Sequence, residues 1–440
     1  MSPANPFYHR TPIRNSLHFF GREQERQQIG TLLANGQSVS VIGPRRIGKS
    51  SLLHQLCQPT LQAAHGPTAD THTIVYFSGE GWQDQPAQVL YGALWAAIRD
   101  VSAAIIAAES LSADLPDATG TMLDFPTFQR ALRRLGHTGQ RLILLLDEFD
   151  ALSRNRNLDE VFFSSLRSLA ATQGVIFVTA STAPLLDLTY AQQSALSSPF
   201  FNIFLPQRVG LLSLAEAHDL LQGTAAIGGL ELTQEQQEQL LSLAGPHPCF
   251  LQIAGYHFWE AQQVGLAGDV DSLQQAFADE TEPHWAYQWR YLTPEEQRTL
   301  ALLPAQQPSA STLQMRLQQS CLVQGERTQL TYLSPLFHSF IQQQQVHQIL
   351  QAGPLLLDQQ TQRAWLLGQQ LILSPQDYRL LTILATDAGQ TLPYGELAQR
   401  LWPEEATVIN QQTRLKTAIS SLRRKLGEQE GMIVTDASGG

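Results

Sequence analysis

Residues 43 to 50 run Gly43-Pro44-Arg45-Arg46-Ile47-Gly48-Lys49-Ser50, a spacing typical of loops that bind phosphate. The spacing of a glycine, four residues and then Gly-Lys-Ser lets successive backbone N–H groups turn toward bound phosphates, and the following helix offers its positive end. A strand-like run at Ser38–Ile42 and a helix-like run at Ser50–Leu56 supply the context that the motif requires. We therefore predict a phosphate-binding loop that includes Ser51, with Lys49 on the β- and γ-phosphates of a nucleotide and Ser50 on Mg²⁺.

A second motif follows at a distance in the sequence that suits a P-loop protein. There an apolar strand at Leu142–Leu146 ends in Asp147 and Glu148. Sheets of α/β proteins hold their ligands at the carboxyl ends of their strands. We expect Asp147 to hold Mg²⁺ through water and Glu148 to polarise an attacking water, which makes hydrolysis the expected chemistry. Alone, such a pair could equally cap a helix, but beside the phosphate-binding loop the catalytic interpretation is favoured.

Strand-like and helix-like runs alternate from Arg14 to Pro206, which is the pattern of a parallel sheet covered by helices. This pattern predicts an α/β P-loop fold. The acidic stretch Glu109–Asp124 contains Pro116 and Gly120, and we expect it to be a surface excursion between two helices. The expected strands are Ser38–Ile42, Thr73–Phe77, Leu142–Leu146, Val175–Thr179 and Phe201–Leu205.

Composition limits the classes of function. The chain has 440 residues, 43% of them hydrophobic, which is enough for about two to four globular units. Its apolar runs are far shorter than the roughly 20 residues that cross a bilayer, and its amino terminus lacks the apolar core of a secretory signal. We therefore expect a cytoplasmic protein without a membrane partner. The net charge of −11 argues against coating nucleic acid with the whole surface, so any DNA contact must be local.

Three cysteines, Cys57, Cys249 and Cys321, are too far apart in the sequence to suggest a metal pair or a disulfide framework. We interpret all three as small apolar residues.

Helical patterns follow the sheet-forming segment. Amphipathic spacing from Ser213 to Phe277, broken at Gly245-Pro246-His247-Pro248, predicts an α-helical lid. Helices near Pro294–Leu303 and Thr312–Gln319, with a short strand pair at Cys321–Leu333, predict a small winged helix. The expected boundaries are 1–13 for an amino-terminal tail, 14–210 for the P-loop core, 211–284 for the lid, 285–350 for the winged helix and 351–440 for a last domain.

Several segments between about Leu17 and Gln345 together resemble the AAA+-related STAND and archaeal-type ATPases. They are Phe19-Phe20-Gly21-Arg22-Glu23, the phosphate-binding loop, Asp147-Glu148, Thr179-Ala180-Ser181-Thr182 and Gly245-Pro246-His247-Pro248. In that family the Gly-Arg-Glu element lies near the adenine, the polar end of the fourth strand senses the γ-phosphate, and the His-Pro element of the lid touches the phosphates.

The resemblance implies ATP and Mg²⁺ as cofactors and nucleotide contacts for Arg22, Ser181 or Thr182, His247 and Pro248. The simpler role is a solvated charge for Arg22, a strand-end cap for Ser181 and a helix start for Pro248. STAND proteins often carry an arginine beside the fourth-strand sensor, and this chain has none there. Candidates for a transition-state arginine, in the same chain or a neighbouring subunit, are Arg154, Arg156 and Arg208, for which surface solvation is the simpler role.

The last segment resembles the OmpR/PhoB-type winged-helix DNA-binding domain of bacterial response regulators. Leu371–Leu381 matches the strand and first helix of that family, Gly395–Trp402 the second helix, and Thr413–Leu426 the recognition helix. Two features depart from the family. Ser420 and Ser421 stand where relatives often carry longer basic side chains, and Ala437 stands where the wing tends to carry an arginine.

The expected recognition helix has an apolar stripe and a basic face. The stripe is formed at helical spacing by Leu415, Ile419, Leu422 and Leu426. The basic face suits phosphate contacts in a major groove, and the simpler alternative is a solvated helix surface. The residues expected to contact double-stranded DNA are Arg414, Lys416, Ser420, Arg423 and Arg424.

These features support three hypotheses of function. The first is a slow, regulatory ATPase switch, in which ATP and Mg²⁺ order the lid and winged helix and so align the carboxyl-terminal domain for DNA binding in transcription. The second is an initiator-like or transposition-helper ATPase that remodels proteins on DNA. The third is an ATPase whose last domain binds a protein partner. An ATP-dependent homo-oligomer is plausible for this class.

Overall fold

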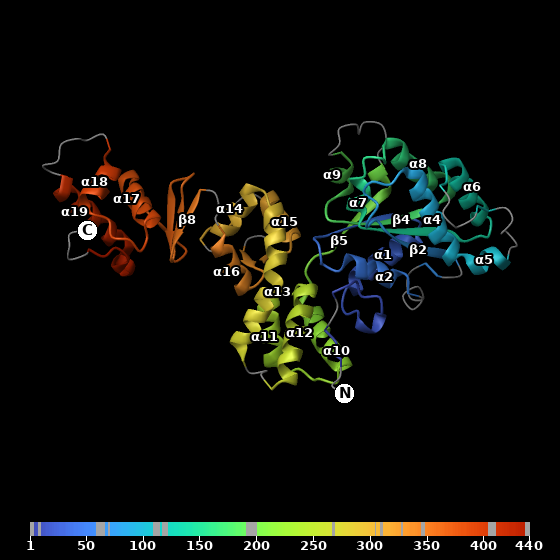
Figure 1. Cartoon of the computed structure of the whole chain (residues 1–440), viewed down its shortest axis with the longest axis horizontal. Coiled ribbons are helices and arrows are strands. Elements are labelled where there is room, and N and C mark those ends of the chain that lie inside the picture. The colour runs from blue at the N-terminus through green and yellow to red at the C-terminus, as the bar shows by residue number, and fades with distance from the viewer. Residues whose placement is uncertain are drawn as a thin grey trace. The chain divides into compact units, whose positions relative to one another are not determined.

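The structure, a computed structural model, describes residues 4–7, 10–58, 67–68, 71–108, 115–116, 122–190, 200–265, 269–303, 305–308, 311–326, 329–344, 348–403 and 411–435. The chain divides into two compact units (Figure 1). The first is Met1–Phe277 together with Gln319–Cys321, and the second is Ala278–Gln318 together with Leu322–Gly440. Among the described residues, every helix is too short or too polar to cross a membrane.

The first unit is built on a five-stranded sheet in the order β2-β3-β4-β1-β5, and every neighbouring pair is parallel. This arrangement confirms the predicted fold class. Because β1 lies between β4 and β5, the loop that leaves its carboxyl end is flanked by strands on both sides. The strands are β1 (Ser38–Ile42), β2 (His72–Ser78), β3 (Arg141–Asp147), β4 (Ile176–Ser181) and β5 (Phe204–Arg208).

Helices cover both faces of this sheet (Figure 1). Successive residues of a strand point to opposite faces, so Ile143 and Leu145 of β3 pack with α1 and α2, whereas Leu144 and Leu146 pack with α4, α6 and α8. Apolar residues on both faces explain why the central strands read as continuous hydrophobic runs. The helices are α1 (Glu23–Ala34), α2 (Lys49–Leu56), α4 (Ala87–Val101), α5 (Ala103–Ala108), α6 (Phe125–Gly136), α7 (Phe149–Ser153), α8 (Glu160–Gln173) and α9 (Leu185–Tyr190).

The last strand of this sheet differs from the prediction. It spans Phe204–Arg208 instead of Phe201–Leu205, because Phe200–Ile203 form a 3-10 turn. Phe200 is buried, and its ring centroid lies 4.9 Å from that of Phe204 and 6.0 Å from that of Phe149. Burial of an aromatic ring is worth about 1.5–3 kcal/mol, which favours the turn that places the ring in the core. Most of the predicted excursion at Glu109–Asp124 lies outside the described residues.

Helices follow the sheet, as predicted for a lid. They are α10 (Leu214–Ile227), α11 (Gln234–Ala244), α12 (Pro248–Gln263) and α13 (Val270–Tyr291). Capping boxes begin α10, where Ser213 pairs with Glu216, and α11, where Thr233 pairs with Gln236. The boundary between the two units falls inside α13, between Phe277 and Ala278.

The second unit begins with a winged-helix motif. Its elements are α14 (Pro294–Leu302), α15 (Ser311–Gln319), the antiparallel hairpin of β6 (Val323–Glu326) and β7 (Gln329–Tyr332), and α16 (Pro335–Gln343). The first two helices and the strand pair lie where the sequence predicts them, whereas α16 was not predicted. The Tyr332 hydroxyl donates to the carbonyl of Leu300 at 2.5 Å, which joins the hairpin to α14.

One short segment at the end of α15 belongs to the first unit. Gln319–Cys321 is grouped with residues 1–277, and Cys321 is 1% exposed. Its side chain lies in the apolar cluster that contains Ile47 of the phosphate-binding loop and Val209 after β5. Burial raises the pKa of the Cys321 thiol to about 12, which agrees with its interpretation as a small apolar residue.

The last part of the second unit combines a four-stranded antiparallel sheet, in the order β11-β10-β9-β8, with three described helices. The helices match the predicted ones, but most of the sheet was missed, because its strands are only three or four residues long and lack clear alternation. Residues 436–440, which include the expected wing position Ala437, lie outside the described residues. The elements are β8 (Ile349–Ala352), β9 (Leu355–Asp358), β10 (Arg363–Leu366), β11 (Gln369–Leu371), α17 (Pro375–Thr386), α18 (Tyr394–Leu401) and α19 (Gln411–Leu426).

Candidate functional site

The predicted phosphate-binding loop joins the carboxyl end of β1 to the amino end of α2. Arg46 and Gly48 both adopt left-handed backbone conformations, with φ of 63° and 99°. Such turns make a concave row of backbone N–H groups that suits an anion, at the positive end of a helix. No neighbouring atom lies within 4 Å of a Cβ built on Gly48, so the loop needs glycine there for its φ angle.

Lys49 is the first residue of α2 and points back over the loop. Its Nζ donates to the carbonyl of Gly43 at 2.8 Å and to that of Pro44 at 2.9 Å. Burial lowers the pKa of Lys49 to about 8, although the carboxylates of Asp150, Asp147 and Glu148 act in the opposite direction. The structure thus brings the predicted lysine and the predicted carboxylates into one electrostatic cluster.

Asp147 and Glu148 stand at the carboxyl end of β3, as predicted. Asp147 is 2% exposed, and its Oδ1 accepts a hydrogen bond from the Glu148 backbone N–H at 2.9 Å. Glu148 is exposed and has a left-handed φ of 48°, which turns its side chain away from the strand direction. Partial desolvation of its carboxylate, followed by the charges of Asp147 and Glu80, raises the pKa of Glu148. A carboxylate with a raised pKa is a better proton acceptor, as a general base requires.

Gly79, after β2, lies close to the backbone of Asp147 and Glu148. Its backbone N–H donates to the carbonyl of Asp147 at 2.8 Å. A Cβ atom at position 79 would lie 2.7 Å from the backbone oxygen of Glu148 and 2.9 Å from that of Asp147. Backbone atoms cannot give way as flexible side chains do, so the close approach requires glycine.

Sequence reasoning missed Asp150, which links two strand ends. Its Oδ2 accepts from the backbone N–H of Thr182 at 2.9 Å, and its Oδ1 accepts from the Thr182 hydroxyl. The hydroxyl of Ser181, at the end of β4, donates to the carbonyl of Ala183 at 2.7 Å. Of the two expected sensor residues, Thr182 is therefore the one in contact with the carboxylate cluster. The signal was present in the sequence as a third acidic residue, two positions after Glu148.

Arg22 connects the phosphate-binding loop to the lid. It is 4% exposed, and its Nη2 donates to the carbonyl of Gly210 at 2.5 Å and to that of Ile47 at 3.2 Å. Its backbone N–H donates to Oε1 of Glu216, the acid of the capping box of α10, at 2.6 Å. Arg22 therefore holds the loop and α10 together through its contacts with protein groups.

The His-Pro element stands at the start of α12. Pro248 is the first residue of that helix, and the preceding His247 is 1% exposed with its ring stacked on Phe250 at 4.1 Å. The next residue, Cys249, accepts a contact from Nη1 of Arg46 at 3.8 Å between nitrogen and sulfur. The lid helix α12 thus touches the phosphate-binding loop through Arg46.

The remaining predicted site residues are Ser51 and four arginines. Ser51 Oγ accepts from the backbone N–H of Ile13 at 2.9 Å, so it anchors the amino-terminal segment. Arg208 is exposed and pairs in register with Ile42, the last residue of β1, which places it beside the loop. Arg45, Arg154 and Arg156 are also exposed.

The residues of this cluster suit a nucleotide with Mg²⁺. The ion prefers hard oxygen ligands and keeps several waters, and Ser50 and Asp147 supply a hydroxyl and a carboxylate. The left-handed turns at Arg46 and Gly48, with Lys49, supply the N–H groups and the positive charge that phosphates need.

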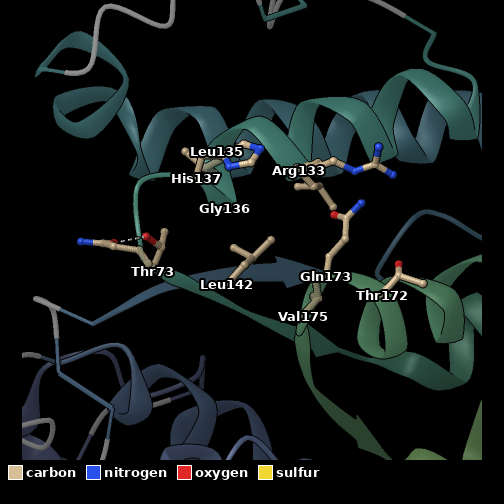
Figure 2. Close-up of a pocket in the computed structure, with 11 residues that line it drawn as sticks. Thr73, Arg133, Leu135, Gly136, His137, Leu142, Thr172, Gln173 and Val175 are labelled. Carbon is tan, nitrogen blue, oxygen red and sulfur yellow. Dashed lines mark hydrogen bonds between the residues drawn. The ribbon is translucent and has the colours of Figure 1, made fainter.

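A cavity of about 210 Å³ lies elsewhere in the first unit (Figure 2). Its floor includes Leu142 and Val175, at the amino ends of β3 and β4, with Thr73 at the start of β2. Figure 2 shows these residues below α6. The phosphate-binding loop leaves the opposite, carboxyl end of the same parallel sheet, so this cavity is separate from the nucleotide site.

The second candidate surface is α19. Its apolar stripe packs into the core of the domain, with Leu415 and Leu422 fully buried. Lys416, Ser420 and Arg424 are all exposed and follow one another at intervals of four residues, so they lie along one face of the helix. This face carries two positive charges with a small residue between them.

Several cations of α19 contact other groups of the domain. Arg423 donates from Nε to the carbonyl of Ile433 and from Nη2 to the Thr435 hydroxyl, each at 2.8 Å. The guanidinium carbon of Arg414 lies 4.5 Å from the ring centroid of Trp402. Lys425 pairs with Asp377 in the capping box of α17. The Nζ of Lys416 lies 5.8 Å from the ring centroid of Tyr394. Of the predicted DNA-contacting residues, Arg414, Lys416, Ser420 and Arg424 are exposed, whereas Arg423 is half-buried.

This fold and this site define a P-loop NTPase with lid and winged-helix segments. Residues 24–309 match the family of novel STAND NTPases 2, which is more than half of the chain, and the chain belongs to that family. Residues 368–440 match the carboxyl-terminal domain of transcriptional regulatory proteins. Both matches agree with the resemblances seen in the sequence.

Individual proteins support these matches over different parts of the chain. The fold is similar to that of the Walker-type ATPase paby2304 of Pyrococcus abyssi, with a TM-score of 0.56 and 15% identity over 76% of this chain and 99% of the other. The response regulator protein PmrA of Pseudomonas aeruginosa is 35% identical over 77 residues, which are 18% of this chain and 34% of PmrA. The transcriptional regulatory protein QseB of Escherichia coli O157:H7 is 35% identical over 80 residues, 18% of this chain and 35% of QseB. The chain thus spans about a third of the length of these curated relatives.

Proposed function

We propose that the chain is a cytoplasmic, ATP-controlled transcription regulator: it binds and slowly hydrolyses ATP in its first unit, and the nucleotide state controls DNA binding by its last domain. The observation that carries the proposal is the presence, in one acidic chain, of a complete P-loop and carboxylate cluster and of an exposed basic face on α19. The family matches at both ends support the same combination.

Different residues of the first unit would have different roles in ATP hydrolysis. Lys49 and the backbone of the loop would bind the phosphates, while Ser50 and Asp147 would hold Mg²⁺. The ion would neutralise charge on the phosphate oxygens. Glu148, with its raised pKa, would accept the proton of the attacking water. Thr182, held by Asp150, would report the state of the γ-phosphate to the end of β4.

The lowered pKa of Lys49 gives a pH prediction. Only the protonated lysine attracts phosphate, and with a pKa of about 8 its charge is lost as the pH rises through that value. Affinity for ADP in a chelator should therefore fall about tenfold between pH 7 and pH 9, by the ratio of protonated fractions. Equilibrium titration with a fluorescent ADP analogue measures this. A Lys49→Arg variant, whose guanidinium stays charged, should lose the pH dependence. An equal fall in ADP affinity for wild type and Lys49→Arg would contradict the assignment of this pH dependence to Lys49.

The basic face of α19 predicts salt-dependent DNA binding. Lys416→Ala should lower the affinity for duplex DNA and reduce the slope of log affinity against log salt by about 0.9, the value for one phosphate contact. The matched control is Lys425→Ala, which removes the same charge from the same helix but from a side chain that pairs with Asp377. That control should lower thermal stability and leave the slope unchanged. Equal slopes for Lys416→Ala and wild type would place the DNA contact elsewhere.

A contact inside the second unit joins the winged helix to the last domain. Arg298 of α14 pairs with Asp358 at the end of β9, and Asp358 is 1% exposed. Burial would raise the pKa of Asp358, but hydrogen bonds from Thr361 and Arg298 lower it on balance, so the carboxylate stays charged. Beside the pair, Leu302 of α14 packs with Leu356 and Trp365 of the sheet. The contact gives the proposed switch a mechanical connection between α14 and the DNA-binding domain.

Breaking this connection should uncouple the switch. Arg298→Ala leaves Asp358 with its bonds to Gln360 and Thr361, so the domain should fold. We expect ATP hydrolysis at the wild-type rate, with the effect of ATP on DNA affinity reduced at least threefold, since a coupling of 1–3 kcal/mol is typical. Arg316→Ala, at an exposed position of α15, is the matched control. Unchanged coupling in Arg298→Ala would show that the signal takes another route.

The experiment that tests the proposed function is binding of the full chain to mixed genomic DNA fragments over a salt series, without nucleotide, with ADP and with ATP and Mg²⁺. Enrichment of particular fragments that requires ATP, and that is lost in Lys49→Ala, is the expected result. Equal DNA binding in every nucleotide state would contradict the switch. Loss of all salt-sensitive DNA affinity would redirect the search to protein partners.

A further inference from the structure

A tyrosine from the neighbouring strand holds Asp147. The hydroxyl of Tyr76, in β2, donates to Oδ2 of Asp147 at 2.7 Å. In the register of the sheet Tyr76 pairs with Leu145, so its side chain reaches diagonally to the residue two positions further along β3. Because the other oxygen, Oδ1, accepts from the Glu148 backbone N–H at 2.9 Å, each carboxylate oxygen has its own donor.

Two donors fix the orientation of the carboxylate. The terminal torsion of an aspartate has a broad minimum, so an unrestrained carboxylate samples many angles. Rotation of the Asp147 carboxylate would break the bond to Tyr76, the bond to Glu148, or both. A carboxylate with a fixed plane presents its remaining lone pairs in fixed directions, which the near-octahedral shell of Mg²⁺ requires.

The tyrosine ring is itself held by the helix of the phosphate-binding loop. His54 of α2 stacks on Tyr76, with ring centroids 4.2 Å apart and an angle of 27° between the planes. His54 lies four residues after Ser50, and residues at that interval share one face of a helix. Its Nε2 is buried and, among the described residues, lacks a hydrogen-bond partner. The imidazole therefore contributes here through ring packing.

We propose that Tyr76 is a positioning residue for Asp147, and that its stacking on His54 ties the direction of this carboxylate to the helix that carries Lys49 and Ser50. The inference rests on the proposed function and deepens it, because it names the residues that set the affinity for the metal ion. Outer-shell partners of ligating groups typically change metal affinity 10- to 100-fold when removed. Because Asp147 is expected to hold Mg²⁺ through water, we expect an effect at the lower end of this range. A purely structural role for the hydroxyl would instead affect only the stability of the fold.

The test compares metal and nucleotide affinity in Tyr76→Phe, which keeps the ring and removes the hydroxyl. The affinity of the ADP-bound protein for Mn²⁺ is measured by electron paramagnetic resonance of the free ion, and the affinity for ADP is measured separately in a chelator. We expect Mn²⁺ affinity to fall about tenfold, with ADP affinity in the chelator within about twofold of wild type. Tyr332→Phe is the matched control, because it removes a hydroxyl bound to a backbone carbonyl in the second unit; it should leave both affinities unchanged.

The stacked ring is tested by two variants of His54. His54→Phe keeps an aromatic partner for Tyr76 and should retain Mn²⁺ affinity, whereas His54→Ala should show part of the loss seen in Tyr76→Phe. Mn²⁺ affinity within twofold of wild type in Tyr76→Phe would overturn the inference, as would an equal loss of ADP affinity in the chelator. Failure of the wild-type chain to bind ADP or Mn²⁺ would instead contradict the proposed function itself.

Discussion

Replacing Glu148 by glutamine is expected to lower the rate of ATP hydrolysis by about 100- to 10,000-fold, the usual contribution of a general base. The amide has the size of the carboxylate but cannot accept the proton of the attacking water. Affinity for ATP should stay close to that of wild type, because Glu148 is exposed and acts on Arg45 and Lys49 of the phosphate-binding loop through its charge. Single-turnover release of phosphate measures the rate, and equilibrium titration measures the affinity.

The matched control for this variant is Glu80→Gln. Glu80 is an exposed carboxylate whose charge contributes to the raised pKa of Glu148. Its removal should leave hydrolysis within a few-fold of wild type and shift the acidic limb of the pH–rate profile downward, because the pKa of Glu148 would fall. If Glu148→Gln hydrolysed ATP at a rate within tenfold of wild type, another group would have to act as the general base. Asp150 would be the first candidate to test.

Replacing Lys49 by alanine should weaken ATP binding by about two orders of magnitude, since loss of a charged hydrogen-bond partner for phosphate costs about 1.5–3 kcal/mol or more. The fold should survive. Burial lowers the pKa of Lys49, which shows that the protein environment opposes its charge, so removing the ammonium group relieves a desolvation cost. The midpoint of thermal unfolding without nucleotide should therefore stay close to that of wild type, because this relief offsets the loss of the hydrogen bonds to Gly43 and Pro44.

Calorimetric titration with ATP and Mg²⁺ gives the affinity for this second variant. The comparison with Arg45→Ala is informative, because Arg45 is an exposed residue of the same loop and its loss should weaken binding only a few-fold. If Lys49→Ala bound ATP as wild type does, the phosphates would have to bind elsewhere. If it unfolded at a lower temperature, the loss of binding would reflect damage to the fold.

The parts of the fold that the sequence predicts are those with local signals. The five strands of the first sheet stand out because each is an apolar run next to a turn or a charged residue, and the phosphate-binding loop carries its own glycine spacing. The shift of β5 shows the limit of such reasoning. Phe200 and Phe201 fit a strand as well as a 3-10 turn, and only the aromatic cluster with Phe149 and Phe204 selects the turn.

The contacts that sequence reasoning missed join residues far apart in the chain. Tyr76 and Asp147 are 71 positions apart, and Asp150 and Thr182 are 32 apart, so their pairing depends on the order of strands in the sheet. Similarly, the sequence does not distinguish among the five residues of α19 that are expected to contact DNA: Arg414, Lys416, Ser420, Arg423 and Arg424. The structure separates Lys416 and Arg424 from Arg423, because Ile433 and Thr435 fold back onto the latter.

The grouping of Gln319–Cys321 with the first unit has a consequence for the order of folding during synthesis. The ribosome releases the chain from the amino terminus, so residues 1–277 emerge before the segment that completes their apolar core around Ile47 and Val209. Until Cys321 emerges, that site lacks one of its buried side chains. Nascent chains arrested shortly before and shortly after this point should therefore differ in their resistance to protease, and a fragment cut at Phe277 should be less stable than the same unit in the whole protein.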